Sequence, residues 1–312
     1  LTSLEISVEP TDDPRVLALT VPTYRVDVYR PCDVVEEILR VYGYNNVEFG
    51  TEMHANLSQK GPTDFSYAMQ QTVSEMRTAE GFSEIMNNSL TAEAYYPAEG
   101  LFSSDKCVRL LNPLSNELCL MRRTLLYGGL ESIAHNINRK LPDLSFYEFG
   151  NVYEFDPAKE STAEKPLAPF VQHARLDLWM TGFRTLPSWT GKGEPSTVYD
   201  LKAIVGNIFR RLGIAERSLT SAQGSDEIFA VKLDISTRSG KRIAEVGILA
   251  TDLLRRFDIG QPVVYATINW DALMQLAAKT KVEYAPLPKT MPVKRDLALL
   301  VDKDVTFARI ED

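Results

Sequence analysis

A pair of alternating apolar runs late in the chain constrains the fold most strongly. Between Phe229 and Ile235 every second residue is apolar, which is the period of a strand with one buried face. The polar turn 236–240 leads into a second strand-like run, 243–249, so the two runs predict an antiparallel hairpin. An amphipathic helix is predicted just before it, over 201–212. Helices beside hairpin-rich strands favour the α+β class, here an antiparallel sheet with flanking helices.

The same patterns predict further elements along the chain. Helices are expected over 65–76, closed by Gly81, and over 125–137. Strands are expected over 15–21, 24–28, 146–153, 176–180 and 295–301. Pro22 should stop the first of these strands, because proline cannot donate a ladder hydrogen bond. The polar stretch 156–169 is expected to be a surface loop.

Breaks in this pattern divide the chain into four parts. A length of 312 residues is typical of two domains. Residues 1–48 carry strands and one helix, and we expect a small, partial α/β domain there. Residues 49–63 lack periodicity and are predicted to be a linker, and 64–285 form the larger α+β domain. Residues 286–312 begin with a proline-rich linker and continue into a strand and the start of a helix.

Composition excludes several classes of protein. No apolar run approaches the ~20 residues that cross a bilayer, so we expect no membrane contact. Leu1 is not a start methionine, and no signal peptide follows it, so we expect a cytoplasmic chain cut from a longer one. The three cysteines form no C-x-x-C pair, which favours buried free thiols over a zinc site. A net charge of −8 disfavours an isolated nucleic-acid-binding module.

Catalytic motifs are not apparent in the sequence. It contains no G-x-x-x-x-G-K-[ST] phosphate-binding loop, no G-x-G-x-x-G, no G-x-S-x-G and no H-E-x-x-H. The three histidines are also widely separated. We therefore assign no catalytic residue and no cofactor-binding residue to this chain.

Four carboxylates near the first helix form the densest candidate site: Asp27, Asp33, Glu36 and Glu37. Asp33 and Glu37 are four residues apart, hence on one helix face, and Asp27 ends the preceding strand. Carboxylate oxygens are ligands that suit Mg²⁺. A structural interpretation is also open, because Asp33 at the N-cap with Glu36 three residues later has the spacing of a capping box. Gly43 is placed to end this helix.

Several short motifs follow one another in a particular order. They are V-P-T-Y-R-V-D at 21–27, D-V-V-E-E-I at 33–38, R-V-Y-G-Y-N at 40–45, G-F-S-E at 81–84, N-P-L-S at 112–115, M-R-R-T-L-L at 121–126, F-G-N-V-Y at 149–153 and P-V-K-R-D-L-A at 292–298. Together they closely resemble the bacterial phenylalanyl-tRNA synthetase beta chain, over essentially the whole sequence. An ordered set of motifs is far more specific than any one of them.

The resemblance implies a fold and a set of partners. It implies an (αβ)₂ assembly that attaches phenylalanine to its tRNA using ATP, with the active site on the alpha chain and tRNA bound by the complete assembly. Residues 64–285 would be a non-catalytic module with the class II aminoacyl-tRNA synthetase fold. Residues 1–48 would be the C-terminal part of the small central domain, and 286–312 would lead into a ferredoxin-fold anticodon-binding domain.

The resemblance also implies that Asp27, Asp33, Glu36 and Glu37 bind a Mg²⁺ ion shared with the alpha chain, at a site expected to be empty in this chain alone. The leading hypothesis is therefore a non-catalytic scaffold whose apolar helix faces pack against the alpha chain and position its catalytic groups. One alternative is an independent Mg²⁺-dependent phosphoryl-transfer or hydrolytic enzyme that uses the same carboxylates. Another is a stand-alone RNA-binding module.

Overall fold

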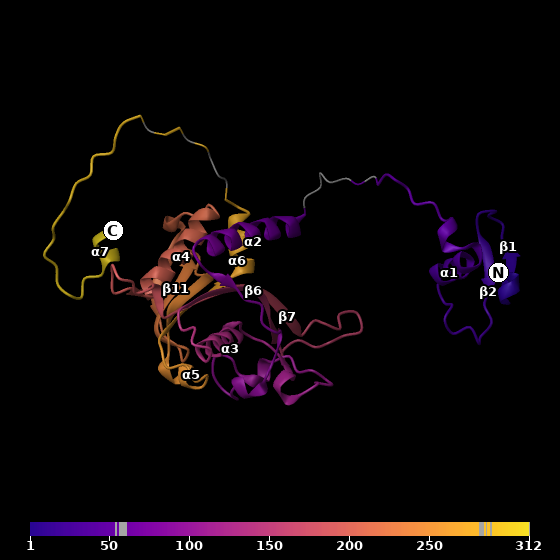
Figure 1. The fold of residues 1–312 in the computed structure, drawn as a ribbon, viewed down its shortest axis with the longest axis horizontal. Helices are drawn as coiled ribbons and strands as arrows, with labels where there is room; N and C mark the ends of the chain where they lie inside the picture. The colour runs from indigo at the N-terminus through magenta and orange to yellow at the C-terminus, as the bar shows by residue number, and fades with distance from the viewer. Residues whose placement is uncertain (54, 56–60, 281–283, 285, 288, 312) are drawn as a thin grey trace. The chain divides into compact units, whose positions relative to one another are not determined.

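The chain forms two compact units. A computed structural model describes residues 1–53, 55, 61–280, 284, 286–287 and 289–311. The first unit comprises Leu1–Lys60 and the second Gly61–Asp312 (Figure 1). No helix in these described ranges combines the length and the apolarity that a bilayer crossing requires. The three cysteines are free thiols: Cys107 and Cys119 are buried, whereas Cys32 is exposed.

The first unit contains one hairpin and one helix. Strand β1 (Ser7–Pro10) pairs antiparallel with β2 (Leu17–Thr20), and helix α1 (Pro31–Tyr42) follows. The predicted strand over 15–21 is thus present but shorter, and its partner lies before it in the chain. The predicted strand over 24–28 is wrong, because this segment forms consecutive turns. Hydrogen bonds from Arg25 N–H to Pro22 O and from Val28 N–H to Arg25 O close these turns.

A seven-stranded sheet organises the second unit. The strand order is β10-β11-β12-β13-β7-β6-β3, and every pair is antiparallel except β3 with β6. The strands are β3 (Ser83–Glu84), β6 (Leu144–Phe155), β7 (Phe170–Thr181), β10 (Leu219–Gly224), β11 (Phe229–Thr237), β12 (Arg242–Leu249) and β13 (Val263–Asn269). The predicted hairpin of 229–249 is therefore confirmed as β11 and β12. The runs 146–153 and 176–180 are parts of the longer strands β6 and β7.

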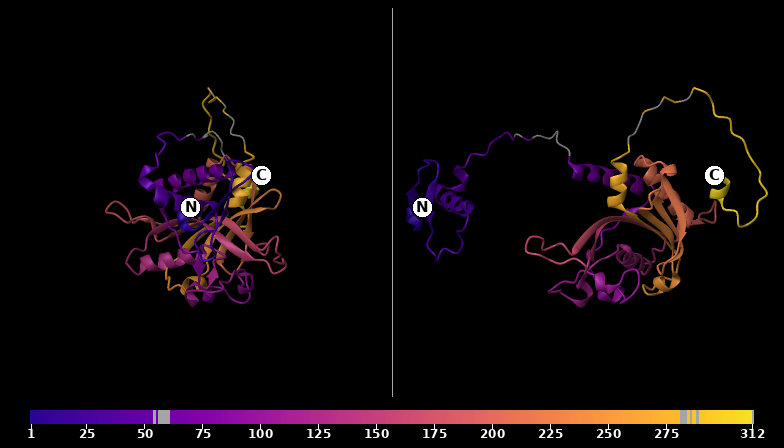
Figure 2. Two further views of the ribbon diagram at one scale, coloured as in Figure 1. Left: turned by 90° about the vertical axis from the view of Figure 1, so that its right-hand side faces the viewer. Right: turned by 180° about the vertical axis from the view of Figure 1, so that it is seen from behind.

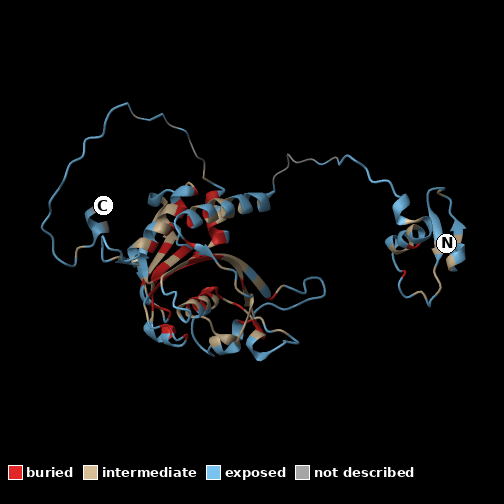
Figure 3. Cartoon of the chain, viewed as in Figure 1, coloured by how far each residue is buried: buried red, intermediate tan, exposed pale blue. Residues whose placement is uncertain are grey.

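Helices cover both faces of this sheet. The helices are α2 (Pro62–Ala79), α3 (Leu126–Ile137), α4 (Val198–Arg211), α5 (Thr251–Arg255) and α6 (Trp270–Ala277). Helices α2, α4 and α6 lie on one face, and α3 and α5 lie on the other (Figures 1 and 2). Each face has its own apolar cluster, and the buried residues concentrate in the sheet and the inner helix faces (Figure 3).

Alternation along β7 shows how one strand serves both layers. Leu176, Leu178 and Met180 join the cluster beneath α4 and α6, whereas Trp179 joins the cluster beneath α3. Successive side chains of a strand point to opposite faces, so Asp177 lies on the same face as Trp179. An acidic residue therefore occupies an inward position on the face covered by α3.

Short elements complete the fold. Two small antiparallel pairs are β4 (Leu90–Thr91) with β5 (Leu120–Met121) and β8 (Phe183–Thr185) with β9 (Glu194–Pro195). The 3₁₀ turns are Thr2–Leu4, Tyr44–Asn46, Glu93–Tyr95, Ser104–Lys106, Asn116–Leu118 and Glu216–Ser218. The predicted surface loop 156–169 connects β6 to β7.

The predicted strand over 295–301 is wrong. These residues are described and belong to no strand, and Leu297 and Leu300 are exposed. A β-strand requires a neighbour that satisfies its backbone hydrogen bonds, and this segment has none among the described residues. A short helix, α7 (Phe307–Glu311), follows.

Candidate functional site

The beginning of α1 holds the first of the predicted metal ligands. Asp33 is the third residue of the helix, not its N-cap, which is Arg30. The Asp33 carboxylate accepts hydrogen bonds from the backbone N–H groups of Arg30 (2.8 Å) and Tyr29 (3.0 Å) and pairs with the Arg30 guanidinium at 3.1 Å. These bonds, led by that from the Arg30 side chain, hold the pKa of Asp33 well below its ordinary value. The predicted capping box from Asp33 to Glu36 is therefore wrong, because the box runs from Arg30 to Asp33, three residues earlier.

Asp27 and Glu37 both form ion pairs with Arg25. Arg25 Nη2 lies 3.2 Å from Asp27 Oδ2 and 3.1 Å from Glu37 Oε1. Arg40 Nη1 lies 3.0 Å from the same Glu37 oxygen. The hydrogen bond from Arg25 lowers the pKa of Asp27. Arginine is the usual partner of a carboxylate in such close pairs, because its planar group presents two parallel donors.

The four carboxylates therefore do not fit a magnesium site as the chain holds them. Three of them are neutralised by arginines, and Glu36 is exposed on the helix. Within the described residues, no three acidic, histidine or cysteine side chains are grouped so that they could hold a metal ion. Proximity in sequence placed these residues at one helix start, but their side chains bond to cations of the chain itself.

The sheet of the second unit carries a different polar group, which sequence analysis missed. Four acidic residues and a threonine stand opposite one another on adjacent strands, from β6 through β7, β13 and β12 to β11. The register pairs Glu148 with Asp177, Asp177 with Thr267, Thr267 with Glu245 and Glu245 with Asp234. We call these five residues the polar row. Charged residues are rarely buried unless they are paired, so a row of them across a sheet face marks a functional candidate.

Glu148 is the most heavily bonded member of the polar row. Its carboxylate is fully buried and lies 2.7 Å from Arg122 Nη1, which is itself buried. Asn87 donates two further bonds to it, from the backbone N–H at 3.2 Å and from the side chain at 2.7 Å. Arg122 also donates to the carbonyl groups of Asn87 and Asn151. This network ties β6 to the segment before β4 and fixes both charges.

Asp177 is a buried and incompletely bonded member of the polar row. It is 1% exposed, and its Oδ2 accepts a hydrogen bond from the buried Tyr265 hydroxyl. Its Oδ1 has no hydrogen-bond partner among the described residues. Burial raises the pKa of Asp177 to about 7, although the hydroxyl groups of Thr267 and Tyr265 act in the opposite direction. Desolvation disfavours the charged carboxylate, which is why the acid form persists.

Replacing Asp177 with asparagine should change how stability depends on pH. The folded-state pKa of about 7 lies above the ordinary 3.8, so between these values the native chain holds a proton that the unfolded chain has released. Raising the pH from 5 to 8 should therefore destabilise the parent relative to Asp177→Asn, by up to about 1.4 kcal/mol per pH unit. Urea unfolding at the two pH values measures this. A parent–variant difference that is independent of pH would contradict it.

A cavity opens beside Asp177 on the same sheet face. It encloses about 160 Å³, and its lining includes Asp177, Arg175 and Tyr265. A shallower hollow of about 350 Å³ adjoins it and shares Arg175, Arg242, Glu245 and Thr267 as lining residues. Arg242 is already paired with Glu245. Among the described residues Glu245 also accepts from Lys232 at 2.7 Å.

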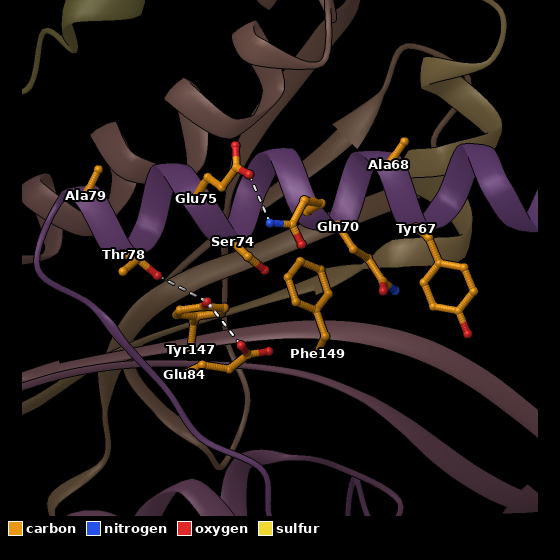
Figure 4. Close-up of a pocket in the computed structure, with 11 residues that line it drawn as sticks. Tyr67, Ala68, Gln70, Ser74, Glu75, Thr78, Ala79, Glu84, Tyr147 and Phe149 are labelled. Atoms are coloured by element: carbon orange, nitrogen blue, oxygen red, sulfur yellow. Dashed lines mark hydrogen bonds between the residues drawn. The ribbon is translucent and has the colours of Figure 1, made fainter.

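A separate groove runs along α2 at the edge of the sheet (Figure 4). It has a volume of about 920 Å³, and Tyr147 and Phe149 point from β6 toward the helix. The Tyr147 hydroxyl lies 3.5 Å from the Thr78 hydroxyl and donates to Glu84 at 3.4 Å. The groove is open on its outer side, and α2 lines it mainly with polar residues. It therefore suits a protein surface better than a small molecule.

The architecture resembles that of a solved aminoacyl-tRNA synthetase. The crystal structure of pyrrolysyl-tRNA synthetase from Desulfitobacterium hafniense aligns with a TM-score of 0.51 over 69% of this chain and 70% of that chain. Sequence identity is 14%, so the likeness concerns the fold alone. The described structure is thus a mixed α/β unit with a large sheet and flanking helices, and its fold is similar to that of this synthetase.

Sequence comparison narrows this class to one family. Residues 50–270 match the phenylalanyl tRNA synthetase beta chain CLM domain, and residues 1–44 match the tRNA synthetase B5 domain. The chain therefore belongs to the phenylalanyl-tRNA synthetase beta chain family, as the ordered motifs predicted. It is 50% identical to the phenylalanine–tRNA ligase beta subunit of Bacteroides thetaiotaomicron and 46% identical to that of Porphyromonas gingivalis. Each comparison covers 100% of this chain and 38% of the relative's length.

Proposed function

We propose that this chain is a non-catalytic part of the beta chain of phenylalanine–tRNA ligase, a class II synthetase that attaches phenylalanine to its tRNA using ATP. The observation that carries the proposal is the match of 46–50% identity along the entire chain to beta subunits of that enzyme. The chain would act in the cytoplasm, within an (αβ)₂ assembly that binds tRNA. Its role there would be to support the active site of the alpha chain.

The buried bonds of the polar row support a scaffold role. An ion pair joins Glu148 to Arg122, and four hydrogen bonds connect this pair to Asn87 and Asn151. Fully satisfied buried networks hold one arrangement and make a domain rigid. A rigid domain can hold a partner's catalytic groups in a productive geometry, which is a large component of enzymatic rate enhancement.

The groove along α2 is the surface we assign to the alpha chain. Tyr67 lines the groove and is 65% exposed. Ala68 and Ser74, further along α2, have small side chains that project little from the helix surface. Small residues on a helix allow close approach of a second backbone, while an exposed aromatic rim residue supplies contact area. The two-residue strand β3 leaves the adjoining sheet edge uncovered among the described residues.

Light scattering of this chain with the cognate alpha chain tests the proposal. We expect a mixed complex, and we expect Ala68→Arg to weaken it by at least about tenfold, because a long charged side chain on α2 would obstruct a partner docked at the groove. Alanine and arginine have similar helix propensities, so the substitution should leave α2 intact. Ala158→Arg in the surface loop 156–169 is the matched control. A wild-type complex that tolerates Ala68→Arg would exclude this groove as the interface.

Repeating the measurement with the full-length beta chain tests the family assignment separately. If this chain forms no complex but the full-length beta chain does, segments outside this chain hold the assembly together. If neither forms a complex with the alpha chain, the scaffold proposal is wrong. Circular dichroism of each variant establishes that loss of binding does not reflect loss of fold.

The shared magnesium site at Asp27, Asp33, Glu36 and Glu37 remains a proposal. Binding would require Asp27 and Glu37 to exchange Arg25 for the metal, and a partner's groups could supply the compensating contacts. We therefore expect calorimetric titration of MgCl₂ into this chain alone to show no saturable binding. Saturable binding that disappears in Glu37→Gln would show instead that the chain forms the site by itself.

A further inference from the structure

The cavity beside Asp177 is lined by two incompletely bonded groups, an acidic side chain and a guanidinium. Asp177 presents a buried Oδ1 that has no hydrogen-bond partner among the described residues. Arg175 is half-buried and lines the same cavity, and its guanidinium forms no ion pair or hydrogen bond with another described side chain. Buried polar groups are normally satisfied, so an unsatisfied oxygen next to an unpaired cation points to a missing partner.

The two groups are held in a fixed relation by the sheet. They are two residues apart on β7, so their side chains project from the same face. On either side, the register places Asn269 of β13 and Gly150 of β6 opposite Arg175, and Thr267 and Glu148 opposite Asp177. A ligand that contacts both groups would therefore span two residues along β7. Because the strand already fixes both groups, binding would cost little protein conformational freedom.

The remaining lining is largely apolar. Leu101, Phe102, Phe229 and the ring of Tyr265 contribute to the wall of the cavity. Its volume of about 160 Å³ is close to that of an engineered apolar cavity of about 150 Å³ that binds benzene. The cavity thus has room for a group of about six carbon atoms, while the adjoining hollow leaves space near Arg175.

We propose that this cavity is a binding site for a small amphoteric molecule, namely a free α-amino acid with an apolar side chain. The amino group donates to Asp177 Oδ1, and the carboxylate is held by Arg175, whose fork matches a carboxylate's two oxygens. The side chain lies against Phe229 and Tyr265. The other two arginines that line the cavity already have carboxylate partners: Arg242 pairs with Glu245 and Arg123 with Glu154. The inference does not depend on the proposed function, because the site lies within this chain.

Calorimetric titration of the 312-residue chain tests the inference. The probes are L-leucine, L-methionine and L-phenylalanine, followed by two analogues of whichever binds most tightly. One analogue is the methyl ester, which keeps the amine and lacks the carboxylate charge; the other is the corresponding acid without the amine. We expect saturable binding of at least one amino acid at one site per chain, and each analogue to bind at least about tenfold more weakly.

Two substitutions assign the contacts. Arg175→Gln should weaken the amino acid by at least about tenfold yet leave the methyl ester unchanged, because that probe makes no charged contact with Arg175. Asp177→Asn should weaken the amino acid but leave the acid without the amine unchanged. Arg238→Gln, in the exposed turn between β11 and β12, is the control of equal charge and should change nothing.

The possible outcomes are distinct. No saturable binding of any of the three amino acids at millimolar concentration overturns the inference, as does an equal effect of Arg175→Gln and Arg238→Gln. The inference is also overturned if ATP binds at this cavity and none of the three amino acids binds there. If Asp177→Asn does not fold, the Arg175→Gln arm decides alone, since Arg175 is only half-buried and unpaired.

Discussion

Replacing Glu148 with alanine should destabilise the larger unit by about 3–5 kcal/mol, the range for removing one partner of a buried ion pair. The substitution leaves the buried Arg122 guanidinium without its carboxylate and removes the acceptor of two Asn87 bonds. Urea unfolding followed by tryptophan fluorescence measures the effect. All three tryptophans lie in the second unit, so this signal reports that unit alone.

The matched control is an ion pair on the surface. Asp252 pairs with Arg255 at 3.2 Å, but its side chain is 94% exposed. Asp252→Ala should change the free energy of unfolding by less than about 1 kcal/mol, because exposed pairs are screened by water. If Glu148→Ala and Asp252→Ala have similar effects, the Arg122–Glu148 network does not hold the sheet to the segment before β4.

Gly129→Ala is expected to destabilise the second unit by about 1–3 kcal/mol, although alanine is normally the better helix former. Gly129 lies in α3, where the helix approaches β7. A Cβ added there would overlap the indole ring of the fully buried Trp179. The ring cannot move away without disturbing the cluster beneath α3, because protein interiors are close-packed.

Gly206→Ala should have the opposite sign. Gly206 lies in α4, and a Cβ added there meets no atom within 4 Å. We therefore expect a gain of about 0.5–1 kcal/mol from helix propensity alone. Thermal unfolding of the two variants side by side distinguishes packing from propensity. A stabilised Gly129→Ala variant would show that α3 and β7 are farther apart than described.

Taken together, the buried features suggest a division of roles on the sheet. Glu148 and Arg122 are held by several hydrogen bonds and an ion pair and stabilise one geometry, as the proposed scaffold role requires. Asp177 and Arg175 lie only one strand away and are incompletely bonded. The same sheet face thus combines a rigid network with a cavity suited to a ligand, and the two can be tested independently.

The predicted metal site and the polar row differ in how far local sequence reveals them. Closeness in sequence groups Asp27, Asp33 and Glu37, yet Arg25, Arg30 and Arg40 are equally close and pair with them. Glu148 and Asp177 did carry a sequence signal: each is an acid inside a run of apolar or aromatic strand residues. Such a residue must be buried with its neighbours, and therefore needs a partner.

The sequence alone determined the local elements and the family. Apolar periodicity placed helices α2, α3 and α4 and the hairpin of β11 and β12, because side-chain spacing directly reflects the geometry of each element. The ordered motifs identified the family because a motif is a property of the local sequence and needs no tertiary structure to be recognised. The strand predictions over 24–28 and 295–301 were wrong, because a strand forms only where a neighbouring strand pairs with it.

Only the tertiary structure decided which residues meet across the sheet. The five members of the row lie on five strands between residues 148 and 267, and the strand register alone brings them together: Glu148, Asp177, Thr267, Glu245 and Asp234. A shift of one residue in any pairing would turn a member of the row to the other face. Register is fixed by packing between distant segments, and for that reason the cavity and its unsatisfied carboxylate follow from the fold rather than from local sequence.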